Sequence, residues 1–360
     1  MSQFGQVVIF GGTGFIGTHL VQHLLREKLA NTIVLADLAP PREEAYCTVL
    51  RHGLASGQVR FVECDARREI CGNLLSLQPD LIANLAAVHR EPGHEPREYF
   101  ETNLKGAENV CRYASETRCN RIVFTSSISP YGPSEDAKNE ESLPVPETAY
   151  GSSKLAAEKI HQGWQTADSD RKLLILRPGV VFGPGEGGNV TRLVRSVVRG
   201  YFAYMGNRQT RKAAGYVKEL CSVIVFGLDH QDRRNQSFTL LNFSMDPPPT
   251  VETFVNAIRK VAGVGRTPMS VPRSILLGAS YPIDYFTRIV GIKQPISPVR
   301  VRKLFRSTYI EPVGLRLLGY EWNFTIEEAF RDWMQDLPKD FSPSRDPRAL
   351  DSLQARKSDA

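Results

Sequence analysis

A glycine-rich segment near the N-terminus constrains the fold more than any other feature of the chain. It reads VVIFGGTGFIG, with Gly11, Gly14 and Gly17 spaced by three. The apolar run Val7–Phe10 predicts a strand, and the amphipathic spacing of Ile16–Glu27 predicts a helix. Glycines at such a turn let the backbone approach a pyrophosphate, which then lies at the helix N-terminus. The sequence therefore predicts a dinucleotide-binding unit at the start of the chain.

Short apolar runs and amphipathic segments alternate through the first half of the chain. The runs predict strands at Thr32–Ala36, Val59–Val62, Leu81–Leu85, Arg121–Thr125 and Leu173–Leu176. Between them, helices are expected over stretches such as Tyr99–Thr117 and Tyr150–Gln165. Strand, helix and strand repeated in this way predict an α/β fold with a Rossmann-type, doubly wound parallel sheet over residues 1–178.

The composition changes after Arg177, where glycine, proline and then basic residues accumulate. We expect a smaller C-terminal α/β substrate domain made of residues 179–215 and 246–338, while residues 216–245 return to the sheet. The helix and strand patterns in this half are Tyr216–Leu228, Gln236–Asn242, Val251–Val261 and Ile326–Leu337. The tail 339–360 is polar and aperiodic, so we expect it to be disordered.

Composition and charge indicate an ordinary globular protein and leave its partners open. The chain has 360 residues, 41% of them hydrophobic, and a formal net charge of +6. This positive excess suits an anionic substrate or an anionic membrane surface, and equally a plain solvated surface. We expect no nucleic-acid partner.

The cysteines and the apolar runs bear on location. The six cysteines include no CxxC pair and no metal-ligand spacing, so we expect reduced thiols and no metal site. The chain begins directly with a predicted strand, and its apolar runs are too short to span a bilayer. These features predict a cytoplasmic protein, with contact at the inner face of the plasma membrane left open.

An acidic residue follows the second predicted strand. Asp37 ends TIVLAD, 20 residues after Gly17. A carboxylate at this place accepts hydrogen bonds from the adenosine ribose hydroxyls and repels a 2′-phosphate. The sequence therefore predicts NAD, rather than NADP, as the cofactor.

Tyr150 and Lys154 lie in the segment YGSSK, four residues apart and so on one face of a helix. A free phenol has a pKa near ~10 and is a poor base at neutral pH. A neighbouring ammonium and a positively charged nicotinamide both favour the phenolate, which makes Tyr150 a general base. Ser127, in FTSSIS at a strand end, is the predicted hydroxyl partner, although such serines also cap turns.

Together with NLAA at 84–87, Asp65 and Asn103, these motifs resemble those of the extended short-chain dehydrogenase/reductases over about residues 7–338. The resemblance implies the catalytic residues Tyr150, Lys154 and Ser127, and a homodimer. It also implies a cofactor site formed by Gly11, Gly14, Phe15, Ile16, Gly17, Asp37, Asp65, Ala66, Leu85, Ala86, Ala87, Asn103, Tyr150, Lys154 and Pro178.

Two departures from the family patterns narrow the reaction. Sugar-nucleotide 4,6-dehydratases carry an Asp-Glu pair after the catalytic hydroxyl residue, where this chain has Ile128 and Ser129. Neither side chain can transfer protons for a dehydration. UDP-galactose 4-epimerases usually carry an asparagine where this chain has Val180, which argues against ordinary nucleotide recognition.

Several segments are similar to bacterial epimerases that act on N-acetylglucosamine linked to undecaprenyl diphosphate. They are AAVHRE, RPGVVFG, GGNVTRLV, RKAAGYV and ISPVRVRKLF. The resemblance implies a 4-epimerase of surface polysaccharide synthesis (lipopolysaccharide, O-antigen), with the predicted substrate residues Ser127, His89, Asn189, Arg211 and Lys212. A UDP-sugar 4-epimerase, a net NAD-dependent dehydrogenase or reductase, and a cofactor-binding regulatory protein are the alternatives.

An apolar stripe in Ser274–Ile292 and a basic run in Arg300–Arg306 complete the pattern. The stripe suits a helix on a membrane surface, and equally a helix pair packed in the core. The basic run suits an anionic lipid or a diphosphate, and equally a solvated face.

Overall fold

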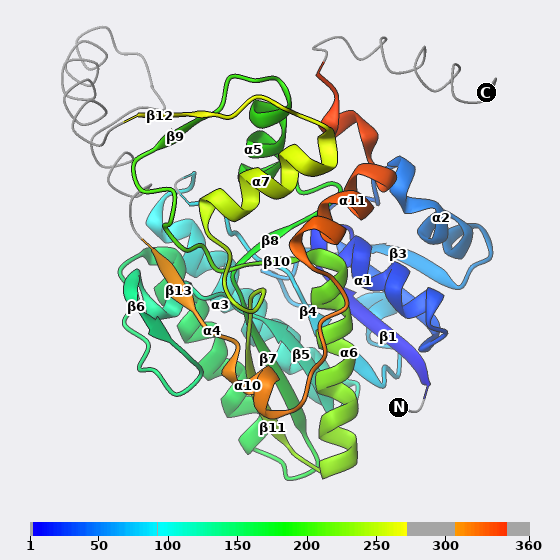
Figure 1. Cartoon of the computed structure of the whole chain (residues 1–360). Coiled ribbons are helices and arrows are strands. Elements are labelled where there is room, and N and C mark those ends of the chain that lie inside the picture. The colour runs from blue at the N-terminus through cyan, green and yellow to red at the C-terminus, as the bar shows by residue number, and fades with distance from the viewer. Residues whose placement is uncertain (1–2, 92, 272–306, 344–360) are drawn as a thin grey trace, which may run out of the picture.

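A central parallel sheet organises the computed structural model, which describes residues 3–91, 93–271 and 307–343 (Figure 1). The strand order is β11-β7-β5-β4-β1-β2-β3. The strands are β1 (Phe4–Phe10), β2 (Ala30–Asp37), β3 (Val59–Glu63), β4 (Leu81–Asn84), β5 (Arg121–Thr125), β7 (Lys172–Pro178) and β11 (Phe238–Phe243). The predicted α/β fold with a doubly wound sheet is confirmed.

Helices cover both faces of this sheet. On one side α1 (Phe15–Arg26), α2 (Thr48–Ala55) and α6 (Val217–Arg234) pack against inward residues such as Val7 and Ile9. On the other side α3 (Pro96–Glu116) and α4 (Ala149–Thr166) pack against Val8 and Phe10. Because successive residues of a strand point to opposite faces, a continuous apolar run serves both cores.

The register of the sheet brings the ends of the strands to one edge. Phe10 of β1 lies beside Ala36 of β2 and Asn84 of β4. Thr125 of β5 lies beside Leu176 of β7. The loops that leave these strands therefore meet at the carboxyl edge, where ligands bind in such sheets.

A smaller region lies beyond that edge (Figure 1). Its elements are β8 (Val180–Phe182), α5 (Asn189–Val198), β9 (Ala203–Met205), β10 (Ala214–Tyr216), α7 (Val251–Ala262), β12 (Met269–Val271) and α11 (Ile326–Asp336). All of them except β12 share a core around Phe182, whose ring stacks 5.2 Å from Phe330 and meets Phe254 edge-on at 5.5 Å. The exact domain boundaries stay a prediction, as does the homodimer.

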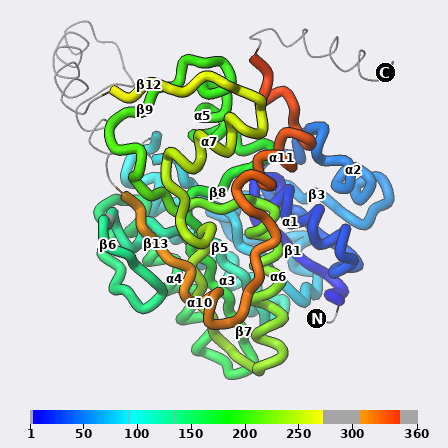
Figure 2. Tube along the Cα trace, viewed as in Figure 1, coloured from blue at the N-terminus to red at the C-terminus, as the bar shows by residue number. Residues whose placement is uncertain are grey.

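Several segments of the chain link the central sheet to the smaller region. The chain leaves β7 for β8 and returns through α6 to β11 (Figure 2). β6 (Ser134–Lys138) pairs with β13 (Thr308–Ile310), and α10 (Val313–Leu317) follows. The apolar stripe Ser274–Ile292 and the basic run Arg300–Arg306 lie outside the described residues.

The start of the C-terminal tail is ordered, so the expected disorder from residue 339 is wrong up to residue 343. Pro338–Phe341 forms a 3-10 turn. The Asp340 carboxylate accepts hydrogen bonds from Arg195 Nη2 at 2.6 Å and Trp333 Nε1 at 3.1 Å, and Phe341 packs edge-on against Trp333. These contacts fix the turn although its sequence has no periodicity. Residues 344–360 lie outside the described residues.

Within the described ranges, no helix is both long and apolar enough to cross a membrane.

Candidate active site

The glycine-rich turn between β1 and α1 approaches the end of β4 closely. Gly11 has a φ of +74°, and a Cβ atom there would lie 2.7 Å from the backbone nitrogen of Ala86. A Cβ atom on Gly17 would lie 2.6 Å from the carbonyl oxygen of Gly11. Larger residues would collide with backbone at both positions. α1 then begins at Phe15, with Gly14 as its N-cap, and no side chain caps its first amide groups.

Asp37 ends β2 beside this turn. Its Oδ2 accepts hydrogen bonds from the backbone nitrogen and the hydroxyl of Thr13, at 3.0 and 2.8 Å. Its Oδ1 accepts one from the Leu38 backbone nitrogen at 2.8 Å. A carboxylate has about four acceptor sites, so acceptor capacity and the negative charge remain for a ligand. The contacts hold Asp37 against the glycine turn, as a ribose-binding residue requires.

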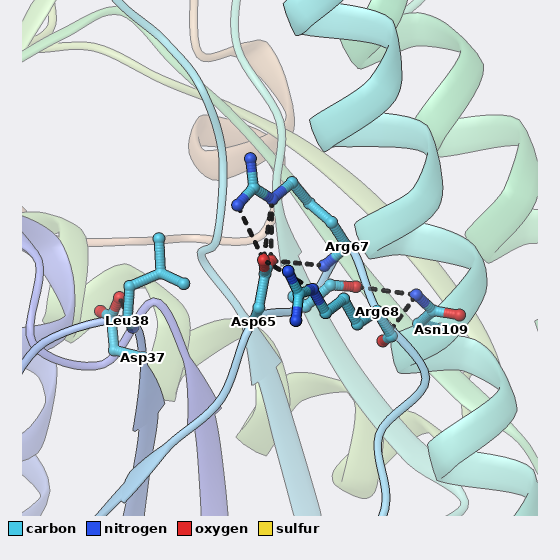
Figure 3. A network of polar contacts seen from close by, with 7 residues as sticks. Asp37, Leu38, Asp65, Arg67, Arg68 and Asn109 are labelled. Atoms are coloured by element: carbon cyan, nitrogen blue, oxygen red, sulfur yellow. Dashed lines mark hydrogen bonds and ion pairs between the residues drawn. The ribbon is translucent and has the colours of Figure 1, made fainter.

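Asp65 lies after the neighbouring strand β3, in a basic loop (Figure 3). Its carboxylate accepts hydrogen bonds from Arg67 Nε at 2.8 Å and Arg67 Nη2 at 2.7 Å. Arg68 approaches the same carboxylate at 3.8 Å. The hydrogen bonds from Arg67 hold the pKa of Asp65 below its usual range. Figure 3 shows this cluster facing the strand end that carries Asp37 and the exposed side chain of Leu38.

Two asparagines of α3 fix the loops at the edge. Asn109 Nδ2 donates to the Ala66 carbonyl at 2.9 Å. Asn103 is buried, accepts a hydrogen bond from the Val88 backbone nitrogen at 3.0 Å, and donates to Ser153 Oγ at 2.9 Å. Asn103 thus joins the loop after β4 to α4, which carries Tyr150 and Lys154.

Tyr150 lies in the first turn of α4, where the Thr148 side chain caps the helix by accepting from Gly151 N at 3.1 Å. The half-buried Tyr150 side chain forms a hydrogen bond with Ser127, just beyond the end of β5. Burial raises the pKa of Tyr150 to about 12, and the hydrogen bond with Ser127 opposes this rise. The lowered pKa expected from the nearby Lys154 ammonium is therefore not found, because loss of hydration outweighs the other effects.

Lys154 is 2% exposed and lies beneath the end of β5. Its Nζ donates to the Thr125 carbonyl at 2.7 Å and lies 4.3 Å from the centre of the Phe124 ring. Burial lowers the pKa of Lys154 to about 7, and the Glu158 carboxylate opposes the fall. The charge of this ammonium is thus sensitive to its surroundings.

Comparison with known proteins identifies the family. The sequence matches the NAD-dependent epimerase/dehydratase family over residues 7–240, which is more than half of the chain. The chain belongs to this family. It is 24% identical to an N-acetyl-α-D-glucosaminyl-diphospho-ditrans,octacis-undecaprenol 4-epimerase of Escherichia coli O157:H7, over 91% of this chain and 94% of that protein.

Other proteins to which the chain is similar are named for different reactions. A decarboxylating sterol-4-alpha-carboxylate 3-dehydrogenase of Candida albicans is 26% identical over 92% of this chain and 97% of its own. Among solved structures, a UDP-glucuronic acid 4-epimerase of Bacillus cereus in complex with NAD superposes with a TM-score of 0.72 at 17% identity. That match covers 94% of this chain and 100% of the other, and it supports the fold.

NAD is the cofactor of this epimerase/dehydratase family member, and the carboxyl edge fits it. The turn at Gly11 and Gly17 leaves no side chain between the backbone and a pyrophosphate, and Asp37 lies beside it. At the other end, Thr125 Oγ1 and Asn84 Oδ1 are buried without a hydrogen-bond partner among the described residues. Buried polar atoms of this kind normally have partners, so these two indicate a ligand or water at the edge.

The remaining predicted cofactor residues lie along the same edge. Leu85, Ala86 and Ala87 follow β4 and are half-buried, and Pro178 ends β7. Phe15 and Ile16 occupy the first turn of α1. Their individual contacts with NAD stay predictions.

The structure brings only some of the predicted substrate residues close to Tyr150 and Lys154. Ser127 contacts Tyr150, and His89 is close enough to Lys154 for charge repulsion. The described hydrogen bonds of the others lead elsewhere: Asn189 accepts from Arg192 at 2.5 Å, and Arg211 Nη1 donates to the Pro248 carbonyl at 2.9 Å. Lys212 is half-buried, which lowers its pKa, and Glu135 opposes that shift.

Sequence reasoning missed a buried ionic network below Tyr150 and Lys154. Glu158 accepts hydrogen bonds from Ser126 Oγ at 2.5 Å and from Arg177 Nε and Nη2 at 2.8 and 2.6 Å. The spacing was visible, because Tyr150, Lys154 and Glu158 recur every four residues on one helix face. The partner Arg177 is remote in sequence, and only the fold brings it there.

Proposed function

We propose that the chain is an NAD-dependent sugar 4-epimerase acting on a diphosphate-linked N-acetylhexosamine, of the N-acetylglucosamine to N-acetylgalactosamine type. Its place would be bacterial surface polysaccharide synthesis, and its intermediate a transient 4-keto sugar. The observation that carries the proposal is the hydrogen bond between Tyr150 and Ser127, next to Lys154 at the carboxyl edge. The full-length similarity to an undecaprenyl-diphosphate-linked 4-epimerase supports the substrate class.

Tyr150, Ser127 and Lys154 divide the proton chemistry between them. When bound, NAD supplies the acceptor for the hydride of the sugar carbon and a positive charge beside Tyr150. Tyr150 Oη takes the proton of the sugar 4-hydroxyl and returns it after the keto sugar has turned. Ser127 orients that hydroxyl, and the Lys154 ammonium stabilises the phenolate. Because burial raises the pKa of Tyr150 to about 12, the base needs both positive charges.

The residues after Ser127 favour epimerisation over dehydration. The Ile128 side chain is apolar, and its backbone nitrogen continues the sheet by donating to the Pro178 carbonyl at 3.1 Å. Ser129 Oγ accepts a hydrogen bond from Ser127 Oγ at 3.1 Å. Neither side chain can serve as the acid or base that elimination of water requires.

The diphosphate must anchor the substrate if the sugar is to turn over. We assign this role to Arg211 and Lys212, which lie just before β10. The Arg211 guanidinium lies 5.1 Å from the centre of the Tyr309 ring and keeps donors beyond its bond to Pro248. Arginine in such a fixed orientation binds diphosphate oxygens well.

A lipid carrier is the second part of the proposal. Val180, at the position where UDP-galactose 4-epimerases usually carry asparagine, is 41% exposed and apolar. In the paired strands β9 and β12, Met269 aligns with Ala203 and Val271 with Met205. Met205 and Met269 therefore share the face opposite the buried Tyr204, and they are 52% and 69% exposed.

The segments around these two strands are basic. Residues 199–212 and 259–271 contain seven lysines and arginines and no acidic residue: Arg199, Arg208, Arg211, Lys212, Arg259, Lys260 and Arg266. Arg208 and Lys260 form ion pairs with Glu252 and Glu327. Exposed methionines on strands that basic segments flank in the sequence suit the surface of an anionic bilayer. We propose peripheral membrane contact through this face.

The similarity to sterol dehydrogenases motivates one alternative, a net dehydrogenase. The deciding experiment incubates the NAD-loaded protein with N-acetylglucosamine linked to undecaprenyl diphosphate, with the UDP-linked sugar, and with a 4-carboxysterol. Sugar analysis and NADH release are followed together. Conversion to the 4-epimer without NADH release is expected for the lipid-linked sugar. Stoichiometric NADH with no epimer would establish the dehydrogenase instead.

A further inference from the structure

Glu158 is a buried carboxylate that takes no part in the proton transfer proposed above. It is 0% exposed and follows Lys154 by one helical turn on the same face of α4. Three donors from two neighbouring strand ends bind it: Ser126 Oγ, Arg177 Nε and Arg177 Nη2. An apolar pair of the same volume is often as stable as a buried ion pair, so stability alone does not explain these charges.

The contacts of Glu158 reach both sides of the reacting groups. Ser126 precedes Ser127, the partner of Tyr150, and its backbone nitrogen donates to the Leu176 carbonyl at 2.7 Å. Arg177 precedes Pro178 at the end of β7. Through Glu158, α4 is therefore fixed to the ends of β5 and β7.

Glu158 is also the carboxylate that acts on Lys154. Burial lowers the pKa of Lys154 to about 7, and the negative charge of Glu158 raises it. His161 and His89 are the other ionisable groups on which the Lys154 charge acts, and Tyr150 lies one helical turn before Lys154 on α4. Burial lowers the pKa of His161 to about 4, so this ring is neutral and supplies no compensating charge.

We propose that Glu158 is a positioning residue, paired with Arg177, that keeps the Lys154 ammonium protonated and holds Ser127 in register with Tyr150. The inference rests on the proposed function, since it gives Lys154 its role in turnover. Without the Glu158 charge, the effect of burial on Lys154 is no longer opposed by this carboxylate, and the ammonium releases its proton more readily.

Two substitutions, one that removes the Glu158 charge and one that keeps it, test this proposal. Glu158→Gln keeps the shape and removes the negative charge, so the alkaline limb of the kcat profile is expected to move down by about one pH unit or more, with an about tenfold loss of kcat above the limb. Ser126→Ala leaves both charges and should lower kcat without moving the limb.

A direct titration separates this inference from the proposed function. The NAD-loaded full chain, labelled with ¹³C-lysine, reports Lys154 through its Cε resonance, which Lys154→Met assigns by its loss. We expect the midpoint to fall in Glu158→Gln and to stay unchanged in Ser126→Ala, whether or not any sugar is converted. An unchanged midpoint in folded Glu158→Gln would overturn the positioning role. A missing epimerase activity in the wild type would overturn only the proposed function.

Discussion

Glu158 of α4 and Arg177 of β7 form a buried ion pair, with Arg177 Nη2 2.6 Å from Glu158 Oε2. The Arg177 guanidinium also lies 4.7 Å from the centre of the Tyr131 ring, and the Tyr131 hydroxyl donates to Asn242 Oδ1 at 2.9 Å on β11. With the bond from Ser126, the pair connects the ends of three adjacent strands, β5, β7 and β11. These contacts connect the carboxyl ends of the three strands beneath Tyr150 and Lys154.

Substitutions of this ion pair should affect the free energy of unfolding and the turnover differently. Glu158→Ala should lower the free energy of unfolding by about 3–5 kcal/mol, because it leaves a buried guanidinium unpaired. The double variant Glu158→Leu/Arg177→Met leaves neither charge unpaired and should recover most of this loss, yet remain far less active than wild type. Urea unfolding and turnover assays measure the two effects. A double variant as unstable as the sum of the single variants would refute the argument.

Cofactor selectivity should depend on Asp37. Its charge repels a 2′-phosphate, so calorimetric titration should show NAD binding in clear preference to NADP. Asp37→Asn can keep an acceptor for Thr13 and loses the charge, so the preference should shrink. Equal or tighter NADP binding by the wild type would contradict this assignment.

Tyr150→Phe should abolish turnover while NAD remains bound. The variant removes the proton acceptor and little packing, and loss of a positioned base typically costs about 10²–10⁴ in rate. Turnover, NAD content and thermal unfolding are to be compared with wild type, with Tyr201→Phe, at an exposed position, as the matched control. Near-normal activity of Tyr150→Phe would mean that the base lies elsewhere.

Stability should fall between pH 6.5 and about 4. Burial lowers the pKa of His19 and His161 from 6.5 to about 4, so in this window the unfolded chain binds protons that the folded chain excludes. Linkage then destabilises the fold progressively as the pH falls, by roughly 3 kcal/mol for each histidine at most. Urea unfolding across this range measures the slope.

Removing one of the two histidines should reduce the acid sensitivity. His161→Phe keeps a ring against Phe124, on which His161 stacks at 4.1 Å, and should flatten the slope. The exposed His52, replaced by glutamine, is the matched control and should leave the slope as it is. An unchanged slope in His161→Phe would show that other groups dominate.

We expect the protein both to bind anionic membranes and to prefer the lipid-linked sugar. Vesicles containing phosphatidylglycerol should bind the protein better than pure phosphatidylcholine vesicles, and salt should weaken this binding. Met205→Ser/Met269→Ser should reduce co-sedimentation by about tenfold, because burial of methionine in the bilayer drives insertion. Leu317→Ser, at an exposed leucine of α10, is the control.

The turnover ratio completes that experiment. The lipid-linked sugar should be converted much faster than the UDP-linked sugar by the wild type. Efficient turnover of the UDP-sugar alone, with no vesicle binding, would assign the protein to the nucleotide-sugar epimerases.

Most of the central sheet was predictable from the sequence. Buried parallel strands appear as short apolar runs because both faces are covered, and such runs located β1 to β5 and β7 of the central sheet. The Pro338–Phe341 turn was not predictable, since its order depends on contacts with Arg195 and Trp333 rather than on periodicity.

The sequence by itself determined the chemistry available to this protein. Local spacing carries the glycine turn at Gly11–Gly17, Asp37 at a strand end, and Tyr150 with Lys154 on one helix face, since each depends on neighbours in the chain. The tertiary structure decided how readily these residues gain or lose a proton. Burial raises the pKa of Tyr150 and lowers that of Lys154, and the compensating pair of Glu158 and Arg177 forms only when α4 packs against β7. Hydration and remote charges depend on packing, and no local pattern records them.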